Sequence, residues 1–491
     1  MTQMDFLTFQ ANFRPDSLAV QDLTYDRSWS FSEYNLLVSK FSAYLLQRGI
    51  KQGDRVACVS KNRAEVVALH LACARCKAIF VPLNWRLALF EIESLLDDCE
   101  PSLVFGDEKA AEIGLAFEPI DNLISDTAAI SGEDLIAFDD DAASLILYSS
   151  GTTGQPKGAI HTEATLMETV LNSTLLYEVD QHSVFLAESP MFHVIGLIAS
   201  VRPVLYNGGR LVISDGFIPE RTLERLSDSE LGITHYFCIP QMANALRQEA
   251  SFNPVNLKHL KALLTGGAPH PEVQIRRWLN DGIAIVDGYG MSETGSLLGM
   301  PHQLNLIDQS AGCVGTSPPR LTIRLLDEQG NIVKAGEPGE VQVKGANLFK
   351  GYWRKSALFN NSFTADGWFK TGDIARQNEQ GFYRVVDRKK DMFISGGENV
   401  YPAEVEAVVL KHPQVFECAM IGVPDDKWGE VGCLFVVCNS DVKCLDLEGL
   451  NHYLASHLAK YKIPKSTVVL DVLPRNGAGK VLKHVLLESV A

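Results

Sequence analysis

The chain has 491 residues, more than the about 250–300 that one hydrophobic core usually accommodates, so at least two domains are expected. Hydrophobic residues make up 46% and charged residues 21%, which excludes disordered and fibrous classes. The net charge of -16 repels nucleic acids and anionic membranes, so an anionic ligand needs a local basic site.

The lack of recognisable targeting signals and the scattered cysteines favour a cytoplasmic protein. The sequence contains no run of about 18 apolar residues, so no transmembrane helix is predicted. The start, MTQMDFLTFQ, lacks the pattern of a signal peptide, and the end, LLESVA, carries no peroxisomal S-K-L. The ten cysteines follow no disulfide framework. Cys73 and Cys76 form a C-x-x-C on an apolar helical pattern, which favours small buried side chains over a redox pair.

Short apolar runs alternate with helical segments through the first two thirds of the chain. A helix is expected at 64–76, and strands are expected at 55–60, 78–83, 102–107, 144–150, 183–188, 210–215, 234–240, 261–267 and 283–290. This alternation predicts a mostly parallel, doubly wound α/β sheet arrangement.

The pattern changes after about residue 311. Residues 321–345 alternate with a period of two around glycine-containing turns, which predicts β-hairpins and a small barrel. A strand at 382–387 leads into a charged string at 388–391. A compact α/β segment of about 100 residues follows, and we place the domain boundary at Lys390.

A glycine- and hydroxyl-rich segment, YSSGTTGQPKG at 148–158, follows the strand at 144–150. Glycines let backbone N–H groups approach a polyanion, and Lys157 adds a positive charge. The segment is not a Walker A loop, because Lys157 follows Pro156 and precedes Gly158. It predicts a grip on triphosphate and pyrophosphate, with an ordinary surface loop as the alternative.

From this loop outward, the sequence resembles the superfamily of acyl-CoA synthetases, nonribosomal adenylation domains and firefly-type luciferases. The resemblance runs from about Thr24 to Lys483 in the family's order. It rests on the loop at 148–158 and on PMFHVIGL from Pro190, LLTGGAP from Leu263, DGYGMSETG from Asp287, GYW from Gly351, WFKTGDIA from Trp368, VDRKKDMFISGGENVYPAEVE from Val386 and PRNGAGK from Pro474.

The resemblance implies both a fold and a reaction. The implied fold is α/β, with an N-terminal AMP-binding domain at 1–389, made of two doubly wound sheets and a small β-barrel, and a small mobile α+β domain at 390–491. The implied reaction is that of an acyl-CoA synthetase, in which ATP and a carboxylate give acyl-AMP and pyrophosphate, and coenzyme A then gives the thioester and AMP. ATP, Mg²⁺ and coenzyme A are the implied ligands.

Nucleotide-binding roles follow from the same resemblance. Glu293 is expected to hold Mg²⁺, with Ser149 as a weaker second ligand. Asp373 is expected to accept hydrogen bonds from the ribose, although alone it would suggest a turn-capping residue. The full expected ATP/AMP set is Ser149, Ser150, Gly151, Thr152, Thr153, Gly154, Lys157, Gly266, Gly267, Ala268, Pro269, Asp287, Gly288, Tyr289, Gly290, Met291, Ser292, Thr294, Asp373, Arg388 and Lys480.

Lys480 is the expected catalytic lysine, although alone it would suggest an exposed surface charge. An ammonium placed between the attacking carboxylate and the α-phosphate offsets their repulsion. Lys390 matches the family's hinge, about which the small domain rotates between the two half-reactions. Gly396 and Gly397 would then line a tunnel for the coenzyme A thiol.

The class of carboxylic acid substrate is inferred from the segment around His193. His193, Glu293 and Lys480 form the expected catalytic set. Amino-acid-activating relatives usually carry Asp at this position, whereas a neutral imidazole cannot pair with an ammonium. The expected pocket wall is Phe192, His193, Val194, Phe237, Ile239, Gly266, Gly290, Met291, Leu297 and Leu298. It contains no Arg or Lys, which favours an apolar fatty, branched or aromatic monocarboxylate.

Alternatives remain open at this point. A stand-alone ligase that loads a carrier protein through acyl-AMP is the second enzyme class, and an oxygenating luciferase-like activity is a remote third. A non-catalytic binding module would be expected to lose Lys480, Glu293 or Asp373, all of which are present. The expected partners are the carboxylate, ATP and coenzyme A, with no nucleic acid and with a homodimer as an open expectation.

Overall fold

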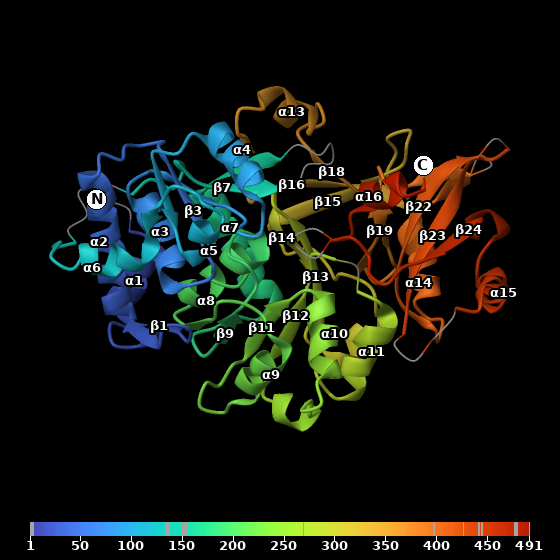
Figure 1. Cartoon of the computed structure of the whole chain (residues 1–491), viewed down its shortest axis with the longest axis horizontal. Coiled ribbons are helices and arrows are strands. Elements are labelled where there is room, and N and C mark those ends of the chain that lie inside the picture. The colour runs from blue at the N-terminus through green and yellow to red at the C-terminus, as the bar shows by residue number, and fades with distance from the viewer. Residues whose placement is uncertain are drawn as a thin grey trace.

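The structure is a computed structural model that describes residues 4–132, 138–149, 156–268, 270–395, 398–425, 427–439, 442, 445–475 and 480–490. A large lobe contains the chain as far as strand β19 (Tyr383–Arg388), and a smaller lobe contains the C-terminal part (Figure 1). The predicted α/β class, with a large N-terminal and a small C-terminal domain, is confirmed. The boundary at Lys390 stays a prediction.

The first sheet carries the predicted phosphate loop, and its strand order is β17-β8-β7-β4-β3-β5-β6. The bounds are β3 Arg55–Val59, β4 Ile79–Pro82, β5 Leu103–Gly106, β6 Glu118–Pro119, β7 Ala143–Ser149, β8 Lys157–Thr162 and β17 Gly351–Tyr352. β3 to β7 pair in parallel, whereas β8 pairs antiparallel with both β7 and β17. The sequence analysis predicted neither β8 nor β17.

The second sheet has the order β14-β13-β12-β11-β9-β10-β1-β2. The bounds are β1 Leu18–Asp22, β2 Arg27–Ser30, β9 Val184–Ala187, β10 Arg210–Ile213, β11 His235–Cys238, β12 Ala262–Thr265, β13 Ile285–Met291 and β14 Gly295–Gly299. Its centre is parallel, and the edge pairs β1–β2 and β13–β14 are antiparallel. The start of the chain therefore completes a sheet whose other strands come much later.

The remaining sheets are mainly antiparallel. In the large lobe, the order β15-β16-β18-β19 comprises Leu321–Leu326, Gly339–Gly345, Phe369–Gln377 and Tyr383–Arg388. The hairpin pattern at 321–345 predicted β15 and β16, and the strand expected at 382–387 corresponds to β19, whereas β18 was not predicted. Isolated bridges from Thr316 to Gly299 and from Gly315 to Tyr383 join this sheet to the end of β14. The small lobe contains β20 Phe393–Ser395, β21 Glu398–Val400, β22 Val415–Asp425, β23 Gly429–Cys438 and β24 Ser466–Val469.

Helices cover these sheets. The α-helices are α1 Phe6–Phe13, α2 Phe31–Gln47, α3 Ala64–Arg75, α4 Leu89–Cys99, α5 Glu108–Glu112, α6 Leu123–Asp126, α7 Glu163–Leu176, α8 Arg202–Tyr206, α9 Pro219–Ser227, α10 Pro240–Gln248, α11 Glu272–Asn280, α12 Leu304–Gln309, α13 Ser356–Asn361, α14 Pro402–Val409, α15 Leu447–His457 and α16 Lys483–Glu488. Short turns lie at η1 Ile120–Asn122, η2 Ile195–Ala199 (a π-helix), η3 Pro254–Leu257 and η4 Lys460–Lys462.

Helix α3 is mostly apolar and buried along its whole length, and its polar residues Glu65, His70 and Arg75 are buried with it. Cys73 and Cys76 are both fully buried free thiols, and burial raises the pKa of Cys73 well above its ordinary value. A thiolate is therefore strongly disfavoured there, and the expectation of small buried side chains is confirmed. One continuous core joins the two large sheets, with Phe80 from the first and Phe185 from the second among its members.

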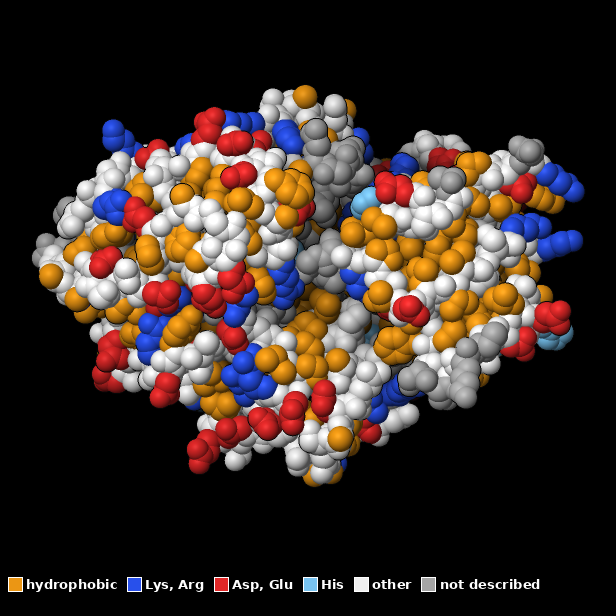
Figure 2. Space-filling view, in the orientation of Figure 1, with side chains coloured by type: hydrophobic (Ala, Val, Ile, Leu, Met, Phe, Trp, Pro, Cys, Tyr) orange, Lys and Arg blue, Asp and Glu red, His pale blue; other side chains and the backbone are white. Residues whose placement is uncertain are grey.

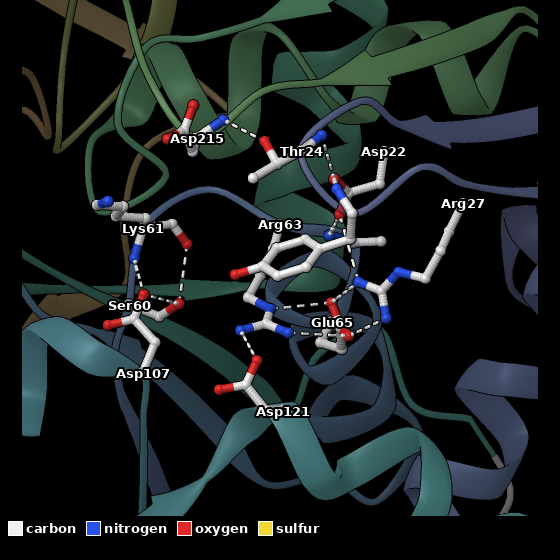
Figure 3. A network of polar contacts seen from close by, with 12 residues as sticks. Asp22, Thr24, Arg27, Ser60, Lys61, Arg63, Glu65, Asp107, Asp121 and Asp215 are labelled. Atoms are coloured by element: carbon white, nitrogen blue, oxygen red, sulfur yellow. Dashed lines mark hydrogen bonds and ion pairs between the residues drawn. The ribbon is translucent and has the colours of Figure 1, made fainter.

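A buried ionic network, which we call the sheet joint, links the second sheet to the segment around α3 (Figure 3). Glu65 receives two hydrogen bonds from Arg27 at 2.7 and 2.9 Å and two from Arg63 at 3.0 and 3.2 Å. Asp22 accepts from the Ala64 backbone at 3.0 Å. Burial alone would raise the pKa of Glu65, but the hydrogen bonds from Arg63 and Arg27 lower it overall. Replacing Glu65 by an apolar residue would take away the acceptor of all four of these bonds, and breaking a buried pair in this way costs about 3–5 kcal/mol.

Candidate active site

The two large sheets meet where the β7–β8 hairpin faces the turn between β13 and β14. The last register pair of the hairpin is Ser149 with Lys157, so the predicted phosphate loop leaves the sheet there. Ser150, Gly151, Thr152, Thr153 and Gly154 lie outside the described residues, and so do Pro269, Gly396 and Gly397. Their predicted roles stay predictions.

Glu293 lies in that turn and is buried, at 7% exposure. The Tyr352 hydroxyl donates to its Oε1 at 2.8 Å, and the Phe349 backbone donates to its carbonyl oxygen at 2.9 Å. Lys157 Nζ lies 5.6 Å from the centroid of the Tyr352 ring. Strand β17 therefore brings the end of the phosphate-loop hairpin next to the carboxylate predicted to hold Mg²⁺.

The surroundings of Glu293 fit a magnesium ion bound through few protein ligands. Among the residues described, Glu293 Oε2 accepts no hydrogen bond. No cluster of three or more His, Cys, Asp or Glu that could hold a metal occurs in that part of the chain. Mg²⁺ usually keeps most of its waters and binds through one or two carboxylates together with substrate phosphates. A single oriented carboxylate near the end of the β7–β8 hairpin is consistent with this mode of magnesium binding.

The turn itself is tightly bonded. Thr294 is fully buried, and its Oγ1 lies 3.1 Å from the Gly295 carbonyl oxygen and 3.3 Å from the Met291 nitrogen. A Cβ on Gly290 would lie 2.1 Å from the Gly295 oxygen, so glycine is required at Gly290. Both residues thus have a structural task, and their predicted ligand contacts stay predictions.

Asp373 forms the second carboxylate of the site and is 4% exposed. The Tyr289 hydroxyl donates to its Oδ2 at 2.5 Å, and Arg388 Nε lies 3.2 Å from its Oδ1. Asp373 and Arg388 are register partners on β18 and β19, so the fold itself makes them neighbours. Burial, followed by the charge of Asp373, raises the pKa of Tyr289 well above its ordinary value and keeps the hydroxyl a donor. A carboxylate has about four acceptor positions, so two remain for ribose hydroxyls.

The end of β12 lies close to the predicted acyl pocket, because a Cβ on Gly266 would lie 3.4 Å from Phe237. Gly267 has φ +81°, and a Cβ there would lie 3.2 Å from Ile195. Asp287 is buried and lies 2.8 Å from His270 Nδ1, and it also accepts from Thr265. Its carboxylate is therefore engaged inside the lobe, and contact with the nucleotide stays a prediction.

Several of the predicted acyl-pocket residues are buried. Phe192, Phe237, Leu297 and Leu298 are between 0% and 5% exposed. His193 Nε2 is buried and has no hydrogen-bond partner among the described residues. Burial, with the charge of Arg86 as the second cause, lowers the pKa of His193 to about 4, so the imidazole is neutral.

Sequence reasoning missed Arg86, which follows β4 and carries the charge that acts on His193. The signal was available, because β4 pairs in parallel with β7 and the carboxyl ends of parallel strands meet at one edge. The expected pocket wall had no cation, and Arg86 adds one near its edge.

Lys480 brings the small lobe to the site. The charges that act on its ammonium are those of Arg388, Asp373, Asp391 and Lys390. Although the residue as a whole remains exposed, partial desolvation and then repulsion by Arg388 lower its pKa to about 8. The structure therefore unites the predicted catalytic lysine with the predicted ribose site. Figure 2 shows a furrow between the two lobes, with Lys and Arg side chains along it.

The contacts between the lobes combine polar contacts with a small apolar cluster of Ile374, Val386 and Tyr401. The Ala403 backbone donates to Asp387 at 2.8 Å, and Lys411 Nζ lies 3.9 Å from Glu272. Burial raises the pKa of Asp387 to about 6, although the nearby charge of Lys483 opposes this rise. Lys390, the predicted hinge, makes a loose 3.9 Å contact with its neighbour Asp391. Polar contacts of this kind suit an interface that opens.

Comparisons with known proteins agree with this geometry. Residues 7–353 match the family model described as AMP-binding enzyme, and residues 404–480 match the AMP-binding enzyme C-terminal domain. The chain is 36% identical over 464 residues to a feruloyl-CoA synthase of an Amycolatopsis species, covering 92% of each chain. It is 32% identical to an indoleacetate–CoA ligase of Aromatoleum aromaticum, covering 100% of this chain and 98% of the relative.

A solved structure supplies the ligand context. The fold matches O-succinylbenzoate coenzyme A synthetase from Bacillus subtilis in complex with ATP and a magnesium ion, with a TM-score of 0.87 and 28% identity. The match covers 99% of this chain and 100% of the other.

Across the described residues, no helix of the structure combines the length and apolar character needed to cross a bilayer.

Proposed function

The chain belongs to the AMP-binding enzyme family, as an ATP-dependent, AMP-forming acid–CoA ligase, and from that premise we propose that its acid is an apolar monocarboxylate. Fatty, branched and aromatic acids all belong to this class. Phe192, Phe237 and Leu297 are buried apolar residues of the predicted pocket. Two relatives act on aromatic acids by name, which makes aryl acids the first to test.

One observation supports the proposed mechanism: the charges of Arg388 and Asp373 in the large lobe act on the Lys480 ammonium of the small lobe. In the first step, a substrate carboxylate oxygen attacks the α-phosphorus, and the bond to the bridging oxygen of pyrophosphate breaks. Lys480 offsets the charge of the two anions, while Asp373 orients the ribose. Glu293 would hold Mg²⁺, with Ser149 in support, and the bound ion would neutralise charge on the phosphates.

In the second step, the coenzyme A sulfur attacks the acyl carbon, and AMP leaves with the electron pair of the broken bond. Lys480 is not needed for this step, so the small lobe can rotate about Lys390. Substituting Lys390 by proline should restrict that rotation. We therefore expect Lys390→Pro to slow thioester formation at least about ten-fold more than pyrophosphate release. Equal slowing of both steps would contradict the hinge.

The deciding assay offers a panel of carboxylates with ATP and Mg²⁺ and measures pyrophosphate release with and without coenzyme A. We expect turnover with apolar monocarboxylates and acyl-CoA as the product. Preference for a dicarboxylate would contradict the proposed acid and would direct attention to Arg86. Turnover that ignores coenzyme A would favour the alternative of a ligase that loads a carrier-protein thiol.

Oligomeric state and location are separate predictions. A homodimer would elute at twice the 54.0 kDa of the chain. The cysteines that the structure describes are free thiols, which is compatible with the expected cytoplasmic location. Cell fractionation tests that location directly.

A further inference from the structure

His161 is a buried histidine in the strand that follows the phosphate loop. It lies in β8, four residues after Lys157, and is 0% exposed. Its Nε2 lies 2.7 Å from the carbonyl oxygen of Ser292, and its Nδ1 lies 3.2 Å from Thr165 Oγ1. The first of these contacts crosses from the first sheet to the turn that carries Glu293.

The partner of Nε2 fixes the tautomer of the ring. A carbonyl oxygen can only accept, so Nε2 carries the hydrogen and Nδ1 is the acceptor. Burial, opposed by the hydrogen bond to Ser292, lowers the pKa of His161 to about 4, which agrees with a neutral ring. The imidazole is thus a neutral donor committed to one backbone atom.

That backbone atom belongs to the peptide that leads into Glu293. Glu293 itself receives two more bonds from the segment 349–352, one from the Phe349 backbone nitrogen to its carbonyl oxygen and one from the Tyr352 hydroxyl to its carboxylate. The direction of the peptide and that of the carboxylate are therefore set jointly by the His161 side chain, the Phe349 backbone and the Tyr352 side chain.

We propose that His161 is a positioning residue that aligns the Glu293 carboxylate with the end of the β7–β8 hairpin at Ser149 and Lys157, so that Glu293 and Ser149 can hold one magnesium ion. This inference rests on the proposed metal role of Glu293. His161 itself touches no substrate. Because Lys157 lies four residues before His161 in β8 and Glu293 follows Ser292, the His161–Ser292 bond holds the Glu293 turn against the Ser149–Lys157 end of the hairpin. A displacement of about 1 Å in such a site can cost about 10²-fold in rate.

The chain offers a closely matched control, His235 in β11. It is also 0% exposed, and burial also lowers its pKa to about 4. Its Nε2 lies 2.9 Å from the Tyr177 carbonyl oxygen, and its Nδ1 lies 2.8 Å from Thr234 Oγ1. His161→Leu and His235→Leu therefore remove the same kind of buried hydrogen bond, but only the first touches the Glu293 turn.

The first measurement needs no turnover. Thermal stability is followed on adding ATP with Mg²⁺ and on adding ATP with EDTA, in the absence of carboxylate. We expect His161→Leu to lose most of the extra rise in Tm that Mg²⁺ produces, and His235→Leu to keep it. His161→Gln, whose amide nitrogen can reach the Ser292 carbonyl, should recover most of the rise. His161→Asn, whose amide is one bond shorter, should not.

The second measurement is the Mg²⁺ concentration that gives half-maximal pyrophosphate release. We expect it to rise about ten-fold in His161→Leu and to stay unchanged in His235→Leu. Unchanged Mg²⁺ dependence in His161→Leu, while Glu293→Gln shifts it, would overturn only the role of His161. Unchanged dependence in Glu293→Gln would overturn the metal role of Glu293 and this inference with it. If His161→Leu does not fold, equal Mg²⁺ curves for the Gln and Asn variants would overturn the inference.

Discussion

The two carboxylates predicted to serve the nucleotide in the large lobe and the predicted catalytic lysine of the small lobe lie in opposite environments. Glu293 and Asp373 are both buried, and each carboxylate accepts a hydrogen bond from a tyrosine, Tyr352 and Tyr289 respectively. Lys480 remains exposed and approaches Asp373 through polar contacts between the lobes. In the proposed mechanism, the carboxylates that hold the magnesium ion and the ribose are thus fixed within one lobe, and the ammonium that the first step needs comes from the other.

Removing the charge of Lys480 should have the largest effect on the rate of pyrophosphate release. Lys480→Ala should slow pyrophosphate release by on the order of 10²–10⁴-fold, because two anions then meet without a neutralising ammonium. Thioester formation from preformed acyl-adenylate should stay largely intact. Separate assays of the two half-reactions check this, with Lys462→Ala as a control that removes an ion-paired lysine of the same lobe. Equal loss in both half-reactions would refute the assignment.

Altering the fixed ribose carboxylate should affect binding. Asp373→Asn removes a charge that pairs with Arg388, and a charge-assisted hydrogen bond contributes about 1.5–3 kcal/mol. We expect the Kd of AMP, measured by calorimetry, to rise about 10- to 100-fold. Asp366→Asn is a suitable control because Asp366 pairs with Arg324 on the surface. An unchanged Kd in Asp373→Asn would place the ribose elsewhere.

Tyr352→Phe tests how much magnesium binding depends on the hydrogen bond that orients Glu293. The substitution removes only the hydroxyl that donates to Glu293 at 2.8 Å. We expect the Mg²⁺ requirement for pyrophosphate release to rise about ten-fold, at the lower limit for a bond to a charged acceptor. Tyr34→Phe removes a buried hydroxyl bond of the same length, to the Ala64 carbonyl, and should leave the requirement unchanged. A shift of equal size in both variants would mean a general loss of stability.

The smallest effect should appear in the pH profile. The active form of Lys480 is the ammonium, and desolvation with repulsion by Arg388 lowers its pKa to about 8. The charge is present below that pH and is lost as the pH rises through it. The kcat/KM for pyrophosphate release should therefore fall to about half near pH 8. Lys480→Arg keeps its charge and should remove this decline, so a decline that persists in the variant would exclude Lys480 as its cause.

The sequence predicted the fold class, most strands and the reaction, because apolar runs and ordered motifs are local signals. The strands expected at 55–60 and 283–290 correspond to β3 (Arg55–Val59) and β13 (Ile285–Met291). The sequence did not predict the hydrogen bonds that orient Glu293. Those bonds depend on the pairing of Ile160 with Gly351, which brings together segments far apart in the chain and leaves no local period. The GYW motif marked the segment, but it did not reveal the partner of its tyrosine.

The placement of β1 has a consequence for how the chain acquires its shape during synthesis. Val20 pairs with Leu211 of β10, so the first strand emerges from the ribosome long before its parallel neighbour exists. Until then, Arg27 and its hairpin lack the sheet that supports them, although Glu65 is already available. We therefore expect the N-terminal segment to depend on a late, long-range closure, the step at which such a chain is most exposed to aggregation.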